Sequence, residues 1–225
     1  MADLKAKAFA EARKRYGEGF VGTQSFLRLE QALSASKTGY TFYMKENEGG
    51  TQFNTEIRLP LTDVFLSYGL QVFIGCPTST TDAAFKLLTY PNAVVMSTSG
   101  AAAAAEVIYN GSMQLTIDNV QYMPQWPLSK HRWVGTSQQR AQATDSPLIP
   151  QDEFYGTTSG LAPVDPIISF SGSQKINLLV NLPQSIATLH PNSRLVMVWH
   201  GIQANNESGL NNGGKPVRRT TRFAR

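Results

Sequence analysis

The sequence contains little of what stabilises or anchors many small proteins. It has a single cysteine, Cys76, so no disulfide can form within the chain and the fold cannot depend on an oxidising compartment. No apolar run approaches the about 18 residues that a membrane-spanning helix needs. The first 15 residues mix charges with alanine, which does not match the apolar centre of a secretory signal peptide. We therefore expect a soluble protein that is made in a reducing cytoplasm.

Charged residues are also scarce, at 16% of the chain, against about 25% in a typical globular domain. Hydrophobic residues make up 41%, which separates this chain from disordered proteins. The cores of subunit interfaces are depleted in charge, so a folded protein of this kind is expected to cover much of its surface with other subunits. The 225 residues are enough for one sizeable core.

The few charges are unevenly distributed. The first 15 residues carry a net charge of +3 and residues 213–225 carry +5, which leaves a body of −4 in a chain of +4 overall. Basic ends on an acidic body suit contact with a polyanion or an acidic neighbouring subunit, or they simply keep the chain soluble. The basic residues of the two ends are Lys5, Lys7, Arg13, Lys14, Arg15, Lys215, Arg218, Arg219, Arg222 and Arg225.

Motifs that carry chemistry are missing as well. The sequence has no phosphate-binding loop, no dinucleotide fingerprint, no paired-histidine zinc helix and no Gly-x-Ser-x-Gly nucleophile turn. Cys76 and the three scattered histidines would meet at a metal only by spatial coincidence, and His200 is better explained as a hydrogen-bonded structural residue. Asp152 and Glu153 are adjacent in a long loop and are interpreted as a solvated patch. We expect no catalytic residues, no metal, no cofactor and no enzyme activity.

One helix is expected at the N-terminal end. Residues 2–15 are rich in good helix formers, and glycines follow them. Leu4, Ala8, Phe9 and Ala12 can share a modest apolar stripe. A helix this short is marginal alone, so it would dock on its own body or on a neighbouring subunit, or remain unpartnered.

Most of the remaining chain shows the apolar–polar alternation of β-strands. Residues 64–76 are the most apolar stretch, and Gly69 within them predicts a β-bulge. Pro60 places the strand that contains it at a sheet edge or a bend. The expected strands are residues 25–30, 39–45, 56–61, 64–76, 113–117, 166–171, 176–182 and 194–202.

Three segments are less regular. Residues 81–88 predict a short helix, with Thr81 or Asp82 near its start. Residues 101–109 open with five alanines and fit either a helix or one strand of a hairpin. Residues 139–166 contain four prolines and no clear period, and loops of this length are usually functional or serve as interaction arms.

Eight or nine strands with few intervening helices predict a mainly β fold, an antiparallel β-sandwich, and a single jelly roll in particular. We expect residues 1–20 to form a basic N-terminal helix or arm, residues 21–206 the jelly-roll-like domain, and residues 207–225 an extended basic tail.

Aromatic and basic residues interleave in one segment. Trp126 and Trp133 lie close to Lys130, His131 and Arg132. Such a pattern can stack bases or sugars, but tryptophan, tyrosine and arginine also concentrate at interface hot spots. We favour the interpretation of both tryptophans as interface anchors.

The order of several phrases resembles that of jelly-roll major capsid proteins of tailless bacteriophages. The phrases are FLRLEQAL, TEIRLPLTDVFLSYGLQVFI, LLTYPNAVV, VIYNGSMQLTIDN, PQW, SGSQKINLLVNLP and RLVMVWHGIQANN, and they span residues 25–206. The resemblance rests on this general pattern, and that family has no catalytic residues to carry over. Double-jelly-roll capsid subunits are longer than this chain, so a single jelly roll fits better.

The resemblance implies a self-assembling capsid subunit. Its partners would be copies of itself, other virion proteins and packaged nucleic acid, held without sequence preference by the basic ends. Its location would be the virion. The alternatives are a minor or vertex virion protein, a lectin-like sandwich that holds sugars on exposed Trp126 or Trp133, and an enzyme on a β scaffold, for which the sequence offers no constellation.

Overall fold

The computed structural model describes residues 2–17, 20–49, 52–91, 96, 100–133, 160–186 and 190–204. The protein is mainly β, as predicted, with two α-helices and one 3₁₀ turn among these residues. None of its described helices is long and apolar enough to cross a membrane. The elements are α1 (Ala2–Tyr16), β1 (Thr23–Ala32), β2 (Gly39–Phe42), β3 (Val64–Cys76), β4 (Lys86–Leu88), α2 (Ala101–Tyr109), β5 (Ser112–Ile117), β6 (Val120–Pro127), η1 (Leu128–His131), β7 (Ala162–Ser171), β8 (Ile176–Asn181) and β9 (Arg194–Ala204).

Apart from the short strand β4, the strands pair from the outside of the chain inwards. The first pairs with the last, β1 with β9, and then β2 pairs with β8, β3 with β7 and β5 with β6, always antiparallel. The chain is therefore one long folded ribbon whose tip is the β5–β6 hairpin. Asp118 and Asn119 turn this hairpin with positive φ angles of 49° and 66°, as a two-residue turn between twisted strands requires.

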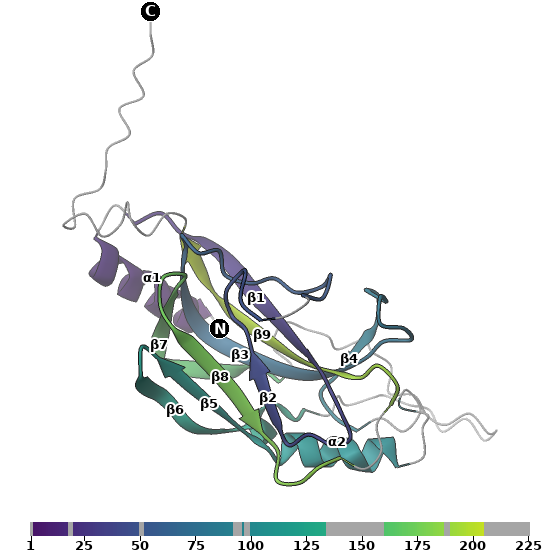
Figure 1. Ribbon diagram of the computed structural model, residues 1–225. Helices are drawn as coiled ribbons and strands as arrows, with labels where there is room; N and C mark the ends of the chain where they lie inside the picture. Colours follow the sequence, from purple (N-terminus) through teal and green to yellow (C-terminus); the bar gives the residue numbers. More distant parts are fainter. Residues whose placement is uncertain are drawn as a thin grey trace, which may run out of the picture.

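Two further antiparallel pairings, β3 with β9 and β5 with β8, roll the ribbon into two sheets. One sheet has the order β1-β9-β3, with β4 and β7 both on the free side of β3, and the other has the order β2-β8-β5-β6 (Figure 1). Two packed sheets that a rolled ribbon joins in this way form a single jelly roll. The predicted fold class is confirmed.

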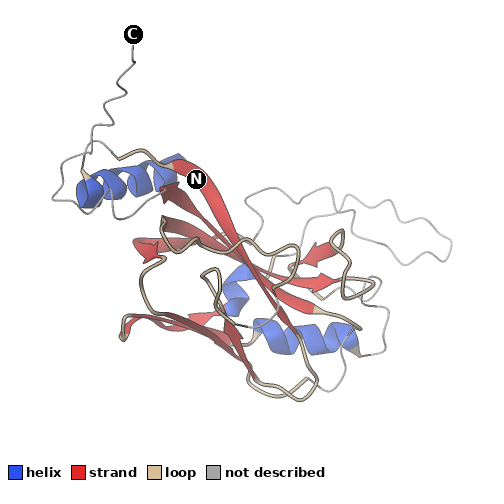
Figure 2. Cartoon of the chain, turned by 45° about the horizontal axis from the view of Figure 1, so that its top comes forward, coloured by secondary structure: helices blue, strands red, loops and turns tan. Residues whose placement is uncertain are grey.

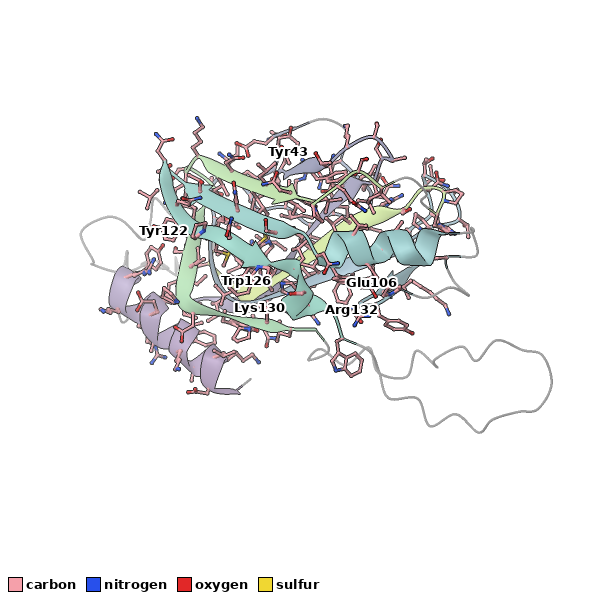
Figure 3. All side chains as sticks on the ribbon, turned by 90° about the horizontal axis from the view of Figure 1, so that it is seen from below. Tyr43, Glu106, Tyr122, Trp126, Lys130 and Arg132 are labelled. Atoms are coloured by element: carbon pink, nitrogen blue, oxygen red, sulfur yellow. The ribbon has the colours of Figure 1, made fainter. Side chains whose placement is uncertain are left out.

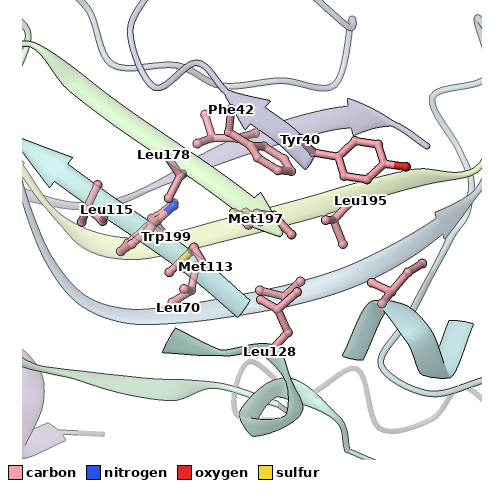
Figure 4. Close-up of a cluster of buried hydrophobic side chains, with 14 of the residues drawn as sticks. Tyr40, Phe42, Leu70, Met113, Leu115, Leu128, Leu178, Leu195, Met197 and Trp199 are labelled. Carbon is pink, nitrogen blue, oxygen red and sulfur yellow. The ribbon is translucent and has the colours of Figure 1, made fainter. Parts of the chain in front are cut away.

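The main core lies between the two sheets. Every second residue of β9 faces it, so Leu195, Met197 and Trp199 are fully buried on one face, as the alternation predicted (Figure 4). The indole ring of Trp199 meets the ring of Phe170 edge-on, with 5.2 Å between centroids and 81° between planes. Edge-to-face pairs of this kind add to the stabilisation from burial alone.

The outer face of the β1-β9-β3 sheet is also covered. β3 is buried at all 13 positions, and its register shifts between Ser67 and Gly69, which confirms the predicted bulge. At one end of this face, α1 buries Ala8 and Ala12 against Leu66 and Ile202. The N-terminal helix therefore docks on its own body. Figure 2 shows it and α2 at opposite ends of the sandwich.

Two predicted elements are wrong. Residues 81–88 form no helix, because the Asp82 carboxylate accepts hydrogen bonds from Thr78 and from the Ala84 amide and so favours a turn, after which β4 begins. Residues 56–61 make only isolated bridges. The alternation places Ile57, Leu59 and Leu61 on one face, but only Leu59 of the three is buried, and Ile57 and Leu61 are 44% and 48% exposed. Pro60 and the buried charges of the segment account for the difference.

The structure also settles the form of several segments that the sequence left open. Residues 101–109 form the helix α2. The turn at residues 172–175 carries the chain from β7 in one sheet to β8 in the other. Of the predicted loop 139–166, residues 162–166 belong to β7, and the part up to residue 159 lies outside the described residues. The strand β6 escaped prediction because Pro124 and Pro127 argue against a strand, and edge strands are where prolines are tolerated.

Candidate functional site

The predicted basic residues of the N-terminal end all lie on α1. Lys7, Arg13, Lys14 and Arg15 are exposed, and Lys5 is half-buried. Lys7 pairs with Asp3 at 3.5 Å, and Arg15 pairs with Glu11 at 2.7 Å. No described carboxylate lies within ion-pair distance of Arg13 or Lys14. The helix thus presents cations to the surroundings while its alanine stripe faces the sheet.

The predicted basic residues of the C-terminal end, Lys215, Arg218, Arg219, Arg222 and Arg225, lie outside the described residues. The last described residue, Ala204, is buried in the same small cluster as Ala8 and Ala12 of α1. The chain therefore leaves the sandwich next to the basic helix. The helix α1 and Ala204 lie at the same end of the β1-β9-β3 sheet (Figure 1).

The outward face of the other sheet has the opposite character. Along β2, β5 and β8, the residues that alternate with the buried ones are exposed or half-buried, and none of them carries a charge. A broad sheet face without a single charge has the composition of the central part of a subunit interface. The outward residues are Gly39, Thr41, Ser112, Gln114, Thr116, Asn177, Leu179 and Asn181.

Trp126 belongs to a small polar cluster at the end of β6. Its indole N–H donates to Nε2 of His131 at 2.9 Å, and the Lys130 ammonium lies 4.1 Å from the centre of the indole ring (Figure 3). Because an indole N–H can only donate, His131 carries its proton on Nδ1, which donates to the Gly160 carbonyl at 3.1 Å. Trp126 thus holds the fold together as well as lining its surface.

The second predicted anchor, Trp133, is 36% exposed. Its backbone is fixed to β4, since its amide donates to the Thr89 carbonyl at 3.3 Å and the Thr89 hydroxyl donates to its carbonyl. Trp133 is therefore partly exposed, and its backbone is fixed by these hydrogen bonds to Thr89. The role of both tryptophans as interface anchors remains a prediction.

His131 is completely buried, and burial is the main cause that lowers its pKa to about 4. The hydrogen bond to Gly160 acts against this effect and the Lys130 charge adds to it. His131 therefore stays neutral in the folded protein at pH values where an exposed histidine is protonated. Burial lowers the pKa of His200 in the same direction, and its Nε2 lies 2.7 Å from Oε1 of Gln71, as a structural histidine would.

A network of buried charges covers the other end of the outer face of the β1-β9-β3 sheet. The Glu30 carboxylate accepts from Arg28 at 2.8 Å and from Arg194 at 2.9 Å, and the Thr55 hydroxyl also donates to it. The neighbouring Glu56 carboxylate accepts from Arg58 and from the Glu30 amide, both at 2.9 Å.

All three arginines of this network lie over aromatic rings, and Arg194 lies over two. The guanidinium of Arg194 lies 4.0 Å from the ring centre of Phe53 and 5.1 Å from that of Phe85. Its Nη2 also donates to the Thr80 carbonyl at 2.6 Å. The network therefore fastens the segments around residues 53 and 80 to the sheet, and both of its carboxylates are paired with arginines. We assign it a structural role.

No three described histidine, cysteine, aspartate or glutamate residues come together as a metal site. Comparison with protein-family models, with curated proteins and with solved structures found no match for this chain. The interpretation of the surface therefore rests on its geometry and charge. Sequence reasoning missed the uncharged sheet face and the buried charges, because both depend on which strands become neighbours.

Replacing Glu30 with glutamine should destabilise the protein strongly. The change removes the negative charge between Arg28 and Arg194, and breaking a buried ion pair by removing one partner costs about 3–5 kcal/mol. Urea unfolding followed by tryptophan fluorescence measures the loss. Glu11→Gln is the matched control, since the pair of Glu11 with Arg15 lies at the surface and should contribute less than about 1 kcal/mol. Equal unfolding midpoints for the two variants would contradict the structural role.

Acid should destabilise the protein through His131. In the unfolded chain this histidine titrates near 6.5, but in the folded protein near 4, so between these values the unfolded state binds the extra proton. Stability is therefore full above pH 6.5 and falls by about 3 kcal/mol as the pH drops towards 4. Thermal unfolding across this range should show a shallower pH dependence for His131→Gln than for the wild type. A profile that the substitution leaves unchanged would be the contrary result. His200→Gln should remove a separate contribution of the same sign.

Proposed function

We propose that this protein is a structural subunit of a bacteriophage capsid, which assembles with copies of itself and with other virion proteins into an icosahedral shell around the genome. One observation carries the proposal: charge is segregated across the sandwich. Cations gather on α1 and the chain leaves for the basic tail beside it, whereas the outward face of β2, β8 and β5 has none.

A shell subunit needs surfaces that other subunits cover on several sides. An uncharged sheet face loses little solvation when a neighbour covers it, whereas each exposed charge would have to be desolvated or paired. Repeated contacts between different patches on identical copies close into rings around local axes. The scarcity of charge in the whole chain supports the same role.

The basic end suits the inner side of such a shell. Lysine and arginine neutralise phosphates without reading sequence, and the resulting affinity falls steeply as salt is added. Lys5, Lys7, Arg13, Lys14 and Arg15 on α1 would share this task with the five basic residues of the tail. The virion is the location that follows from the proposal, and no catalytic step is part of it.

The lectin-like alternative has less support. Sugar binding needs an open aromatic face, but the Trp126 ring is stacked beside His131 and has Lys130 over it. Its indole N–H is already used by His131. Of the two predicted anchors, Trp133 is the more exposed. Nothing else in the described residues favours a sugar site over a subunit contact.

Purified protein should form large closed particles, or discrete oligomers that assemble further. The measurement is light scattering followed by negative-stain electron microscopy over a range of salt concentrations. The expected driving force is the burial of uncharged surface, so assembly should survive salt better than nucleic-acid binding does. A monomer that stays monomeric at every protein and salt concentration, with added nucleic acid as well, would contradict the proposal.

Removing residues 213–225 should reduce the nucleic acid in the particles without preventing assembly. The deletion takes away five positive charges and no acid, and it begins nine residues after the last described residue, Ala204. The ratio of absorbance at 260 and 280 nm in purified particles gives the nucleic-acid content. A full-length tail with its five basic residues replaced by glutamine is the control for length. Particles with unchanged nucleic-acid content would show that the tail has another role.

A further inference from the structure

A groove runs along one side of the sandwich, between the edge strands β6 and β7. Its volume is about 160 Å³. Three buried apolar side chains belong to its lining, Met123, Val164 and Ile168, and Tyr122 beside them is 50% exposed. The rest of the lining comes from Pro124, Gln125, Trp126, Asp165 and Pro166. The groove is thus an aromatic- and proline-lined slot with an apolar base.

The size and the edges of this groove restrict what it can bind. A volume of 160 Å³ equals that of about five water molecules and is below the about 300 Å³ of the smallest typical ligand pockets. It has room for one or two side chains. Prolines stand on both bordering strands, two on β6 and two on β7, and they offer no N–H to an added strand. A partner must therefore insert side chains.

A second groove adjoins the first. It lies between α1 and β7, has a volume of about 370 Å³, and shares Asp165 and Pro166 with the first groove. Its cations are Lys7, Lys14 and Arg15 of α1, against Glu11 and Asp165. No described acid pairs with Lys14. Lys7 is paired with Asp3 and Arg15 with Glu11, so Lys14 is the cation that this groove offers to an acidic partner.

The chain itself contains a segment with the matching order of chemistry. Residues 147–153 read Pro-Leu-Ile-Pro-Gln-Asp-Glu and belong to residues 134–159, outside the described part. Prolines three apart match the repeat of the extended polyproline helix, which aromatic-lined grooves bind. Asp152 and Glu153 follow Pro150 by two and three residues, about 7–10 Å in an extended chain. With that spacing, the prolines can lie in the first groove while the two acidic residues lie in the second.

We propose that residues 147–153 of a neighbouring copy bind along these two grooves, with Pro147 and Pro150 in the slot beside Tyr122 and with Asp152 and Glu153 on the cations of α1. The inference rests on the proposed shell function, which requires each subunit to hold its neighbours. The contact lies on the side of the sandwich between β6 and β7, away from the uncharged sheet face. The segment exchanged between copies would link them as an arm.

Disulfide cross-linking tests this arrangement without altering the groove walls. Gln125 stands at the groove and Gln151 follows the second proline, so Gln125→Cys and Gln151→Cys are made as two separate variants and mixed before assembly. Cys76 is buried, and burial raises the pKa of its thiol to about 11, so it stays protonated and slow to react. Oxidation of the assembled mixture should give a covalent dimer that neither variant gives alone.

Thr41→Cys is the matched control for Gln125→Cys, because it is exposed on β2 at the far edge of the same sheet. It should cross-link to Gln151→Cys at least about tenfold more slowly, which corresponds to about 1.4 kcal/mol of preferred contact. Equal rates would overturn the inference. So would a disulfide that forms only within one chain of a Gln125→Cys, Gln151→Cys double variant, since the segment would then bind its own groove.

A charge exchange provides the second test. Lys14→Glu and Glu153→Lys should each reduce the cross-linking yield severalfold, and a mixture that places the two changes on opposite partners should restore it. No restoration would overturn the assignment of Glu153 to α1. Particles that assemble normally without any groove cross-link would refute the arm contact and leave the proposed shell function intact, so the two failures are distinguishable.

Discussion

The central pair of strands, β3 and β9, imposes the main constraint on this structure. β3 is buried at every position, so the sheet that contains it needs a cover on both faces. A sandwich supplies only one cover, namely the second sheet. The chain meets the other requirement with α1 at one end of the outer face and with the charged network at the other. Much of what distinguishes this jelly roll from a bare sandwich follows from that need.

The two covers differ in physical kind. The helix buries small side chains, Ala8 and Ala12, which lets it lie close to the sheet while its cations stay in water. The network instead brings Glu30, Arg28 and Arg194 out of water and compensates them by ion pairs and by aromatic rings. One end of the outer face therefore keeps its cations exposed, and the charges at the other end are buried in ion pairs.

Local pattern was sufficient to predict most of the strands, the bulge at Gly69, the N-terminal helix and the class of fold. These features depend on alternation and on glycine, which are properties of neighbouring residues. The order in which the strands pair could not be derived in the same way. The uncharged sheet face, the groove beside β6 and the buried charges depend on that order, so they could not be predicted either. The segment 56–61 shows where local pattern fails. Ile57 and Leu61 have the spacing of a strand, but the hydrogen bonds of Glu56 and Arg58 determine how the segment is held.

The helix α1 and the end of β9 lie at the same pole of the sandwich. α1 docks beside Ala204, where the described chain finishes, and the turn at residues 33–38 lies at the opposite end of the sandwich, after β1 has run its full length. A peptide inserted into the exposed turn near Lys37 would therefore emerge at the pole opposite α1 and Ala204.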